Sequence, residues 1–355
     1  MRMEFQKDKF SPHKEIIRSS FLADNIVIVD GFPGCGKTLF GPIISSLQRV
    51  EIMQYMFEIE FICRLFDLHK IEKDAAVTMV KMLTDHKLYQ SMMGRDTNFR
   101  YSDLSSVFNY PKPLQYFKRI FGKGDMAIPQ KIDELNPILS FVAHDLLAYS
   151  DPIFEALRGR LTFIEVVRHP LYMIIQQTLN MERLFASSQA RDIQIYFEHK
   201  NEELPYFCSG WEDLYLESSY IDRAIYSMSY SLDKNKSKVS DLESPSKGVN
   251  YLRIPFEKFV IEPQPFLKSI TLLLKTDFSN KTSKALRGQN VPRTKVSEGI
   301  PLEIYKRCGW VPPNKDLNEG EELEKRRDWA VEMGASKKAL EVLDKISLEY
   351  EEANL

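Results

Sequence analysis

The chain has 355 residues, of which 43% are hydrophobic and 28% charged, and its formal net charge at neutral pH is −2. This composition is typical of a globular protein with a large core, and the near-zero charge disfavours a general nucleic-acid binder. The four cysteines are scattered, with no CxxC pair and no histidine at metal-ligand spacing, so we expect reduced thiols and no metal site.

The N-terminal segment lacks the apolar core of a signal peptide. No stretch approaches the ~18 uninterrupted apolar residues that a membrane span requires. We therefore expect a cytoplasmic protein that does not bind membranes. The sequence carries no signal for the oligomeric state.

The strongest motif follows a short apolar run, Ile26–Val29, that predicts a buried parallel strand. Residues 31–38 satisfy the pattern G-x-x-x-x-G-K-[ST], and an apolar stretch from Leu39 to Leu47 predicts a helix. Glycines in such a loop let successive N–H groups point into one concavity, and the lysine adds a full positive charge. We expect the loop to hold the phosphate or a sulfate-like group of a nucleotide. Its residues are Gly31, Phe32, Pro33, Gly34, Cys35, Gly36, Lys37 and Thr38.

Helical periodicity predicts two packed helices at 53–69 and 75–89, within a helical insertion of about 51–130. The methionine and aromatic stripe of these helices is predicted to be core. In the following loop two arginines flank an asparagine, and this trio could grip an anionic substrate or be solvated. We take Arg95, Asn98 and Arg100 as candidate substrate-binding residues.

Two more strands are predicted at 137–143 and 161–167, each followed by a helix. The first ends in His144-Asp145 and the second in Arg168-His169-Pro170. Alternation of strands and helices with short connections implies a parallel sheet with right-handed crossovers. We expect a single α/β domain over residues 1–355, in which helices flank a central parallel sheet in a three-layer P-loop fold.

The second half of the chain is less regular. Aromatic residues gather around Tyr196, Trp211 and Tyr226, as a substrate cover or as plain helical packing. The polar run 231–250 predicts a mobile loop. A strand is expected at 251–255 and a helix at 265–274. The charged tail of about 317–355 predicts solvent-facing amphipathic helices.

Four segments, in this order, resemble the P-loop sulfotransferases, which transfer a sulfuryl group from 3′-phosphoadenosine 5′-phosphosulfate (PAPS). The resemblance spans roughly residues 20–300. The segments are Gly31–Leu39 (GFPGCGKTL), Pro137–Leu147 (PILSFVAHDLL), Phe163–Pro170 (FIEVVRHP) and Tyr251–Phe259 (YLRIPFEKF).

The resemblance implies a role for several residues. His144 would be the general base that takes the proton of an acceptor hydroxyl or amine, and Lys37 with the loop would stabilise the sulfuryl group and the leaving phosphate. Arg168 would hold the 3′-phosphate of PAPS, and no metal is required. Residues similar to the rest of the family's donor site are Gln176, where the family has a serine, and Arg287, Gly288 and Arg293. The acceptor is expected to be polar or carbohydrate-like.

The loop departs from the family pattern in one respect. Gly34 follows Pro33 where the family has a lysine, and the lysine stands at position 37, as in proteins that use ATP or GTP. A Mg²⁺-dependent small-molecule kinase is therefore an alternative, with Thr38 and Asp145 holding the ion. A nucleotide-binding module without chemistry is a third possibility.

Overall fold

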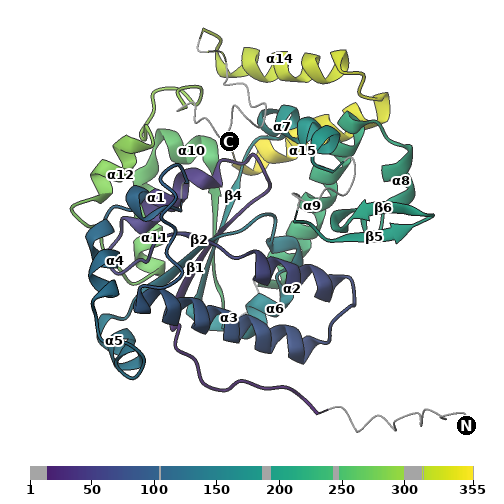
Figure 1. Cartoon of the computed structure of the whole chain (residues 1–355). Coiled ribbons are helices and arrows are strands. Elements are labelled where there is room, and N and C mark those ends of the chain that lie inside the picture. Colours follow the sequence, from purple (N-terminus) through teal and green to yellow (C-terminus); the bar gives the residue numbers. More distant parts are fainter. Residues whose placement is uncertain are drawn as a thin grey trace, which may run out of the picture.

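A five-stranded parallel sheet forms the centre of the molecule in the computed structural model (Figure 1). The structure describes residues 14–103, 105–185, 193–242, 248–299, 314 and 316–354. The central strand, β1, pairs with β3 on one side and with β4 on the other. In spatial order the strands are β2 (Gln54–Tyr55), β3 (Ile138–Val142), β1 (Asn25–Asp30), β4 (Leu161–Val167) and β7 (Asn250–Pro255).

The alternation of side chains along β1 explains the three layers. Val27 and Val29 belong to one buried cluster, whereas Ile26 and Ile28 belong to another on the opposite face of the sheet. Because both faces are covered, β1, β3 and β4 are almost completely buried and mainly apolar, and this confirms the predicted α/β fold. β2 was not predicted, because its two residues lie within a stretch whose periodicity is helical.

Helices cover both faces of the sheet (Figure 1). The cluster around Val27 includes side chains from α1 (Phe40–Ser45), α7 (Pro170–Arg183), α9 (Tyr220–Leu242), α10 (Phe256–Ile261) and α11 (Pro263–Leu273). The cluster around Ile26 includes side chains from α2 (Phe57–Asp67), α3 (Lys73–Met93), α5 (Ala127–Leu135) and α6 (Asp151–Leu157).

Smaller elements complete the described fold. They are α4 (Pro113–Ile120), α8 (Glu212–Glu217), α12 (Thr282–Gly288), the antiparallel pair β5 (Tyr196–His199) and β6 (Glu202–Pro205), and the 3₁₀ turns η1 (Lys37–Leu39), η2 (Val107–Asn109), η3 (Leu147–Tyr149), η4 (Arg158–Arg160) and η5 (Tyr206–Cys208). Helices α2 to α5 occupy the stretch in which a helical insertion is expected.

The charged C-terminal stretch forms two helices, α14 (Glu319–Glu332) and α15 (Lys337–Asn354). Asn318 begins α14 with a capping box, in which its side chain accepts from the backbone N–H of Glu321 and the Glu321 side chain accepts in return. α14 packs against α7, and α15 packs against both α7 and α9. The two helices therefore lie against the main body of the protein (Figure 1).

The prediction of a polar loop at 231–250 is wrong for residues 231–242, because these residues form the C-terminal half of α9. Its polar side chains find buried partners. The hydroxyl of Ser231 donates to Asp145, and the amide of Asn235 donates to Glu165. Residues 243–247 lie outside the described part of the chain, as does Cys308, whereas Cys35, Cys63 and Cys208 are free buried thiols.

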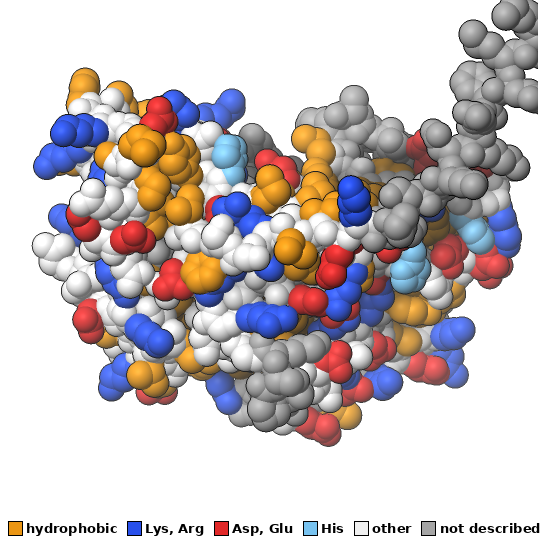
Figure 2. Space-filling view, turned by 90° about the horizontal axis from the view of Figure 1, so that it is seen from below, with side chains coloured by type: hydrophobic (Ala, Val, Ile, Leu, Met, Phe, Trp, Pro, Cys, Tyr) orange, Lys and Arg blue, Asp and Glu red, His pale blue; other side chains and the backbone are white. Residues whose placement is uncertain are grey.

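None of the described helices combines the length and the apolar composition that crossing a bilayer would take. On the face seen in Figure 2, basic and acidic side chains are interspersed. The charges on this face therefore largely offset one another, in keeping with the small net charge of the sequence.

Candidate active site

The glycine-rich loop follows the central strand and packs tightly against the core. Lys37 is 5% exposed, and its Nζ donates a hydrogen bond of 2.8 Å to the carbonyl oxygen of Gly31. Gly36 has a φ of +92°, and a Cβ at this position would lie 2.3 Å from Cε2 of Phe256. Only glycine satisfies both conditions, so the Phe256 ring supports the loop from within the core.

The ends of β1 and β3 are tied together beside this loop. The carboxylate of Asp30, the last residue of β1, accepts from the backbone N–H groups of Leu146 and Leu147, at 2.9 and 2.8 Å. Burial raises the pKa of Asp30 above its ordinary value. The N–H of Asp145 donates in turn to the carbonyl of Gly31, at 3.2 Å. These bonds bring the segment that contains His144 alongside the loop.

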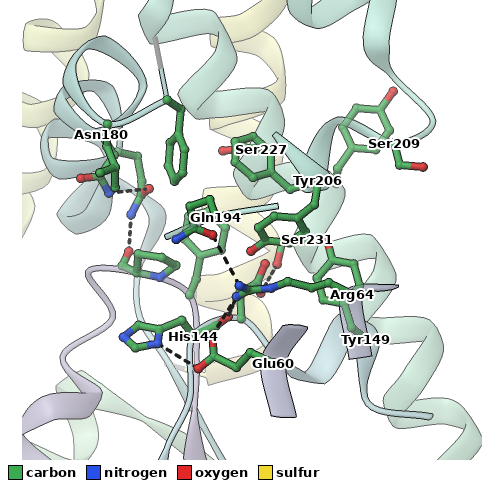
Figure 3. Close-up of a pocket in the computed structure, with 18 of the residues that line it drawn as sticks. Glu60, Arg64, His144, Tyr149, Asn180, Gln194, Tyr206, Ser209, Ser227 and Ser231 are labelled. Atoms are coloured by element: carbon green, nitrogen blue, oxygen red, sulfur yellow. Dashed lines mark hydrogen bonds and ion pairs between the residues drawn. The ribbon is translucent and has the colours of Figure 1, made fainter. Parts of the chain in front are cut away.

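Three side chains contact the His144 ring, and one of them, Glu60, is labelled in Figure 3. Its Nδ1 lies 3.0 Å from Oε1 of Glu60. Tyr55 and Phe57 stack on it, with ring centroids 5.6 and 5.7 Å from the imidazole centroid and interplanar angles of 19° and 4°. The His144 side chain is 34% exposed, so the ring is fixed in orientation and still accessible.

Glu60 is itself held by Arg64, one turn later on α2. The two side chains form an ion pair of 2.9 Å, and each is 2% exposed. Arg64 also donates to the carbonyl oxygen of His144, at 3.1 Å, and its guanidinium lies 4.2 Å from the ring centroid of Tyr206. Glu60 and Arg64 were not predicted as functional residues. The available signal was an acid and a base four residues apart, a spacing that places both on one face of α2.

Arg168 follows β4 and reaches the loop from the side opposite His144. Its Nη1 donates to the carbonyl of Gly34, at 3.2 Å, and its guanidinium lies 4.5 Å from the centroid of Phe256 and 4.9 Å from that of Tyr172. Its Nε lies 3.8 Å from the carboxylate of Glu257 and, within the part of the chain that the structure describes, makes no hydrogen bond. Arg168 therefore retains a buried N–H donor for an additional acceptor.

The other residues expected at the donor site are only partly brought together. Gln176 lies beside the loop, because its Oε1 would be 3.1 Å from a Cβ on Gly34. The guanidinium of Arg293 lies 5.6 Å from the Phe256 centroid, on the ring that Arg168 also contacts. Arg287 and Gly288 are exposed at the end of α12, and no described hydrogen bond or ion pair joins them to the loop.

A cavity of about 270 Å³ connects the loop with His144 (Figure 3). Its wall is mainly aromatic and aliphatic. Several of the aromatic residues come from the region around Tyr196, Trp211 and Tyr226, for which the sequence allows either a substrate cover or plain helical packing. The aromatic members are Phe32, Phe57, Tyr149, Phe185, Tyr206, Phe207, Trp211 and Tyr230. The ionisable members besides these tyrosines are Glu60, Arg64, His144, Asp145 and Lys234.

Asp145 is a second buried acid of this cavity, besides Glu60. Its backbone has a φ of 55°, in the left-handed region, and its Oδ1 accepts from the Ser231 hydroxyl at 2.6 Å. Burial raises the pKa of Asp145 to about 6, and the nearby charge of Asp30 adds to that effect. Asp145 is thus poised to change protonation state in weakly acidic solution.

The loop with Arg95, Asn98 and Arg100 does not line this cavity. The Asn98 amide donates to Asp103 and Ser105, at 3.2 and 3.0 Å, and Arg100 lies 3.3 Å from Asp103. Asn98 and Arg100 therefore brace their own loop, next to η2, and none of the three residues lines the cavity. Among the described residues, no group of three or more His, Cys, Asp and Glu side chains is arranged to hold a metal ion.

The sequence matches no family model and no curated protein. Three solved structures to which the chain is similar are sulfotransferases. The sulfotransferase domain of the curacin biosynthetic pathway is 13% identical, with 86% of this chain and 96% of that chain covered and a TM-score of 0.41. The sulfotransferase domain of the Synechococcus PCC 7002 olefin synthase is also 13% identical, with 94% of this chain and 99% of that chain covered and a TM-score of 0.37. Mouse sulfotransferase SULT7A1 complexed with PAP is 11% identical, with 91% of this chain and 89% of that chain covered and a TM-score of 0.35. The chain is thus similar to solved sulfotransferases.

Proposed function

We propose that this protein is a sulfotransferase that moves a sulfuryl group from PAPS to a hydroxyl or amine group of a small acceptor. One observation carries the proposal. The ends of three adjacent strands bring Lys37, His144 and Arg168 to one glycine-rich loop, with a cavity open to both the loop and the histidine. Ligands of open α/β sheets bind at this edge, outside the carboxyl ends of the strands.

The residues around the loop fit a donor with two anionic ends. Lys37, Thr38 and the loop amides would hold the 5′-phosphosulfate, and Arg168 with Arg293 would hold the 3′-phosphate. The buried Nε of Arg168 supports this assignment, because an anion would provide the acceptor that this donor lacks. Bound PAPS supplies the activated sulfuryl group and its phosphate leaving group.

Each residue then has a defined task. His144 removes the proton of the acceptor as the bond from acceptor oxygen to sulfur forms and the bond from sulfur to the 5′-phosphate oxygen breaks. Lys37 and the loop amides stabilise the charge that develops on the sulfuryl oxygens and on the leaving phosphate. The stacked rings around His144 and the mainly apolar cavity hold the acceptor in line and limit the access of water.

The lining of the cavity favours a different class of acceptor from the one that the sequence suggests. A mainly aromatic and aliphatic lining favours a molecule with an apolar body and one nucleophilic group, instead of the polar or carbohydrate-like acceptor that the sequence suggests. A panel of hydroxylated acceptors tests this preference. Aromatic or aliphatic alcohols are expected to react and free sugars are not, and turnover of sugars alone would contradict it.

A Mg²⁺-dependent kinase is the second candidate, because Asp145 lies next to the loop. The favourable observation is its backbone hydrogen bond to Gly31. Against this role, its carboxylate is buried and engaged by Ser231.

A thermal-shift panel separates the candidates. Adenosine 3′,5′-bisphosphate (PAP), ADP and GDP are each tested with and without Mg²⁺, since a ligand that binds only the folded state raises the melting temperature. We expect stabilisation by PAP without metal. Lys37→Ala should abolish it, whereas the exposed-lysine variant Lys123→Ala should retain it. Stabilisation by ADP or GDP alone, and only with Mg²⁺, would favour the kinase instead.

A further inference from the structure

The contacts of Glu60 determine which nitrogen of His144 carries a proton. Both carboxylate oxygens of Glu60 are engaged, Oε1 by Nδ1 of His144 and Oε2 by the guanidinium of Arg64. An ionised carboxylate only accepts hydrogen bonds, and a guanidinium remains charged in proteins. Nδ1 must therefore donate to Glu60, and in the neutral ring Nε2 is left with the free lone pair.

The position of Glu60 is fixed from several directions. Glu60 and Arg64 are each 2% exposed, and Arg64 is anchored by its bond to the His144 carbonyl and by its stacking on Tyr206. Figure 3 shows the carboxylate between the imidazole and the guanidinium. A buried ion pair is by itself weak evidence for a gain in stability. We therefore look for the role of Glu60 in its contact with His144.

We propose that Glu60 is a positioning residue that holds His144 in the Nδ1–H tautomer, with Nε2 available in the cavity. The role of His144 as a base rests on the proposed function, whereas the tautomer does not. When Nε2 takes a proton from an acceptor, the resulting imidazolium lies against the Glu60 carboxylate, which stabilises its charge, and beside the rings of Tyr55 and Phe57.

The test is the tautomer of His144 by NMR. The six histidines are labelled with ¹⁵N, and His144 is assigned from the signal that His144→Ala removes. Spectra are recorded in alkaline solution, where a histidine ring is neutral. We expect Nδ1–H in the native protein. In Glu60→Gln, Arg64 should take the remaining oxygen and the amide NH₂ should face Nδ1, so the signal should change to Nε2–H.

Glu58→Gln is the matched control, because Glu58 is an exposed acid on the same helix, and we expect it to leave the His144 signals unchanged. A native Nε2–H tautomer would overturn the proposal. An Nδ1–H tautomer that persists in folded Glu60→Gln would also overturn it. If Glu60→Gln does not fold, the native tautomer alone decides.

The proposed function can fail separately. If PAP does not bind, the sulfotransferase assignment falls and the tautomer result stands. With an acceptor in hand, Glu60→Gln is expected to lower kcat by roughly 100-fold at an unchanged KM for the donor. A purely structural role would instead lower the melting temperature and leave kcat and the tautomer of the folded fraction unaltered.

Discussion

At the scale of single residues, the loop depends on contacts that only glycine permits. Gly36→Ala should destabilise the fold by about 2–4 kcal/mol, because the new methyl group meets Phe256 and the backbone is left-handed. Gly210→Ala is the control, since Gly210 has a similar φ of +96° with no neighbour within 4 Å, and it should cost only about 1 kcal/mol. Urea unfolding measures both, and equal losses would contradict the packing of Phe256 under the loop.

The buried carboxyl group of Asp145 gives a prediction for the pH dependence of stability. The folded-state pKa of Asp145, about 6, lies above its ordinary 3.8, so the folded state binds this proton more tightly than the unfolded state does. The contribution of Asp145 to the free energy of unfolding is therefore fully present below about pH 4 and is lost as the pH rises through 6. The loss amounts to ~3 kcal/mol, at about 1.4 kcal/mol for each pH unit.

Asp145→Asn removes this titration and retains an acceptor for Ser231. Between pH 4 and 7 the variant should gain stability relative to the native protein, in unfolding experiments at each pH. The charged groups around Asp145 are Asp30, Lys37 and Arg64, and they remain in the variant. A difference in unfolding free energy that does not change with pH would contradict the raised pKa.

At the scale of elements, the C-terminal helices support the strand ends that carry Arg168. The Tyr350 hydroxyl of α15 donates to Glu257, at 2.5 Å, and Glu351 lies 3.0 Å from His169. Tyr350→Phe leaves a buried oxygen of Glu257 without this donor, which should cost about 1–3 kcal/mol. The exposed Tyr220 provides the control Tyr220→Phe, which should leave the melting temperature almost unchanged. If the two variants melt alike, α15 does not support the site in this way.

The predictability of each element follows from its environment. The glycine loop and the strands β1, β3 and β4 could be predicted, because their apolar runs are set by burial on both faces. The second half of α9 could not, because Ser231 and Asn235 resemble a solvated loop until Asp145 and Glu165 are known to face them. Glu60 was hidden for the same reason, since its partners stand four and eighty-four residues away.

At the scale of the whole molecule, the proposed function requires three strand ends to converge on one ligand. β1 lies between β3 and β4, so the loop has His144 on one side and Arg168 on the other. That order could be anticipated only as far as a parallel sheet places the carboxyl ends of its strands at one edge. Asn98 and Arg100 show the limit, because the sequence does not reveal that Asp103 and Ser105 engage these side chains.

The most direct measurement is calorimetric titration with PAP and with adenosine 5′-monophosphate, both without metal. If Arg168 holds a 3′-phosphate, PAP should bind the native protein at least tenfold more tightly than the monophosphate, a difference of about 1.4 kcal/mol or more. Arg168→Ala should remove that difference while His144→Ala keeps it. Equal affinities for the two nucleotides in the native protein, or binding that requires Mg²⁺, would contradict the account.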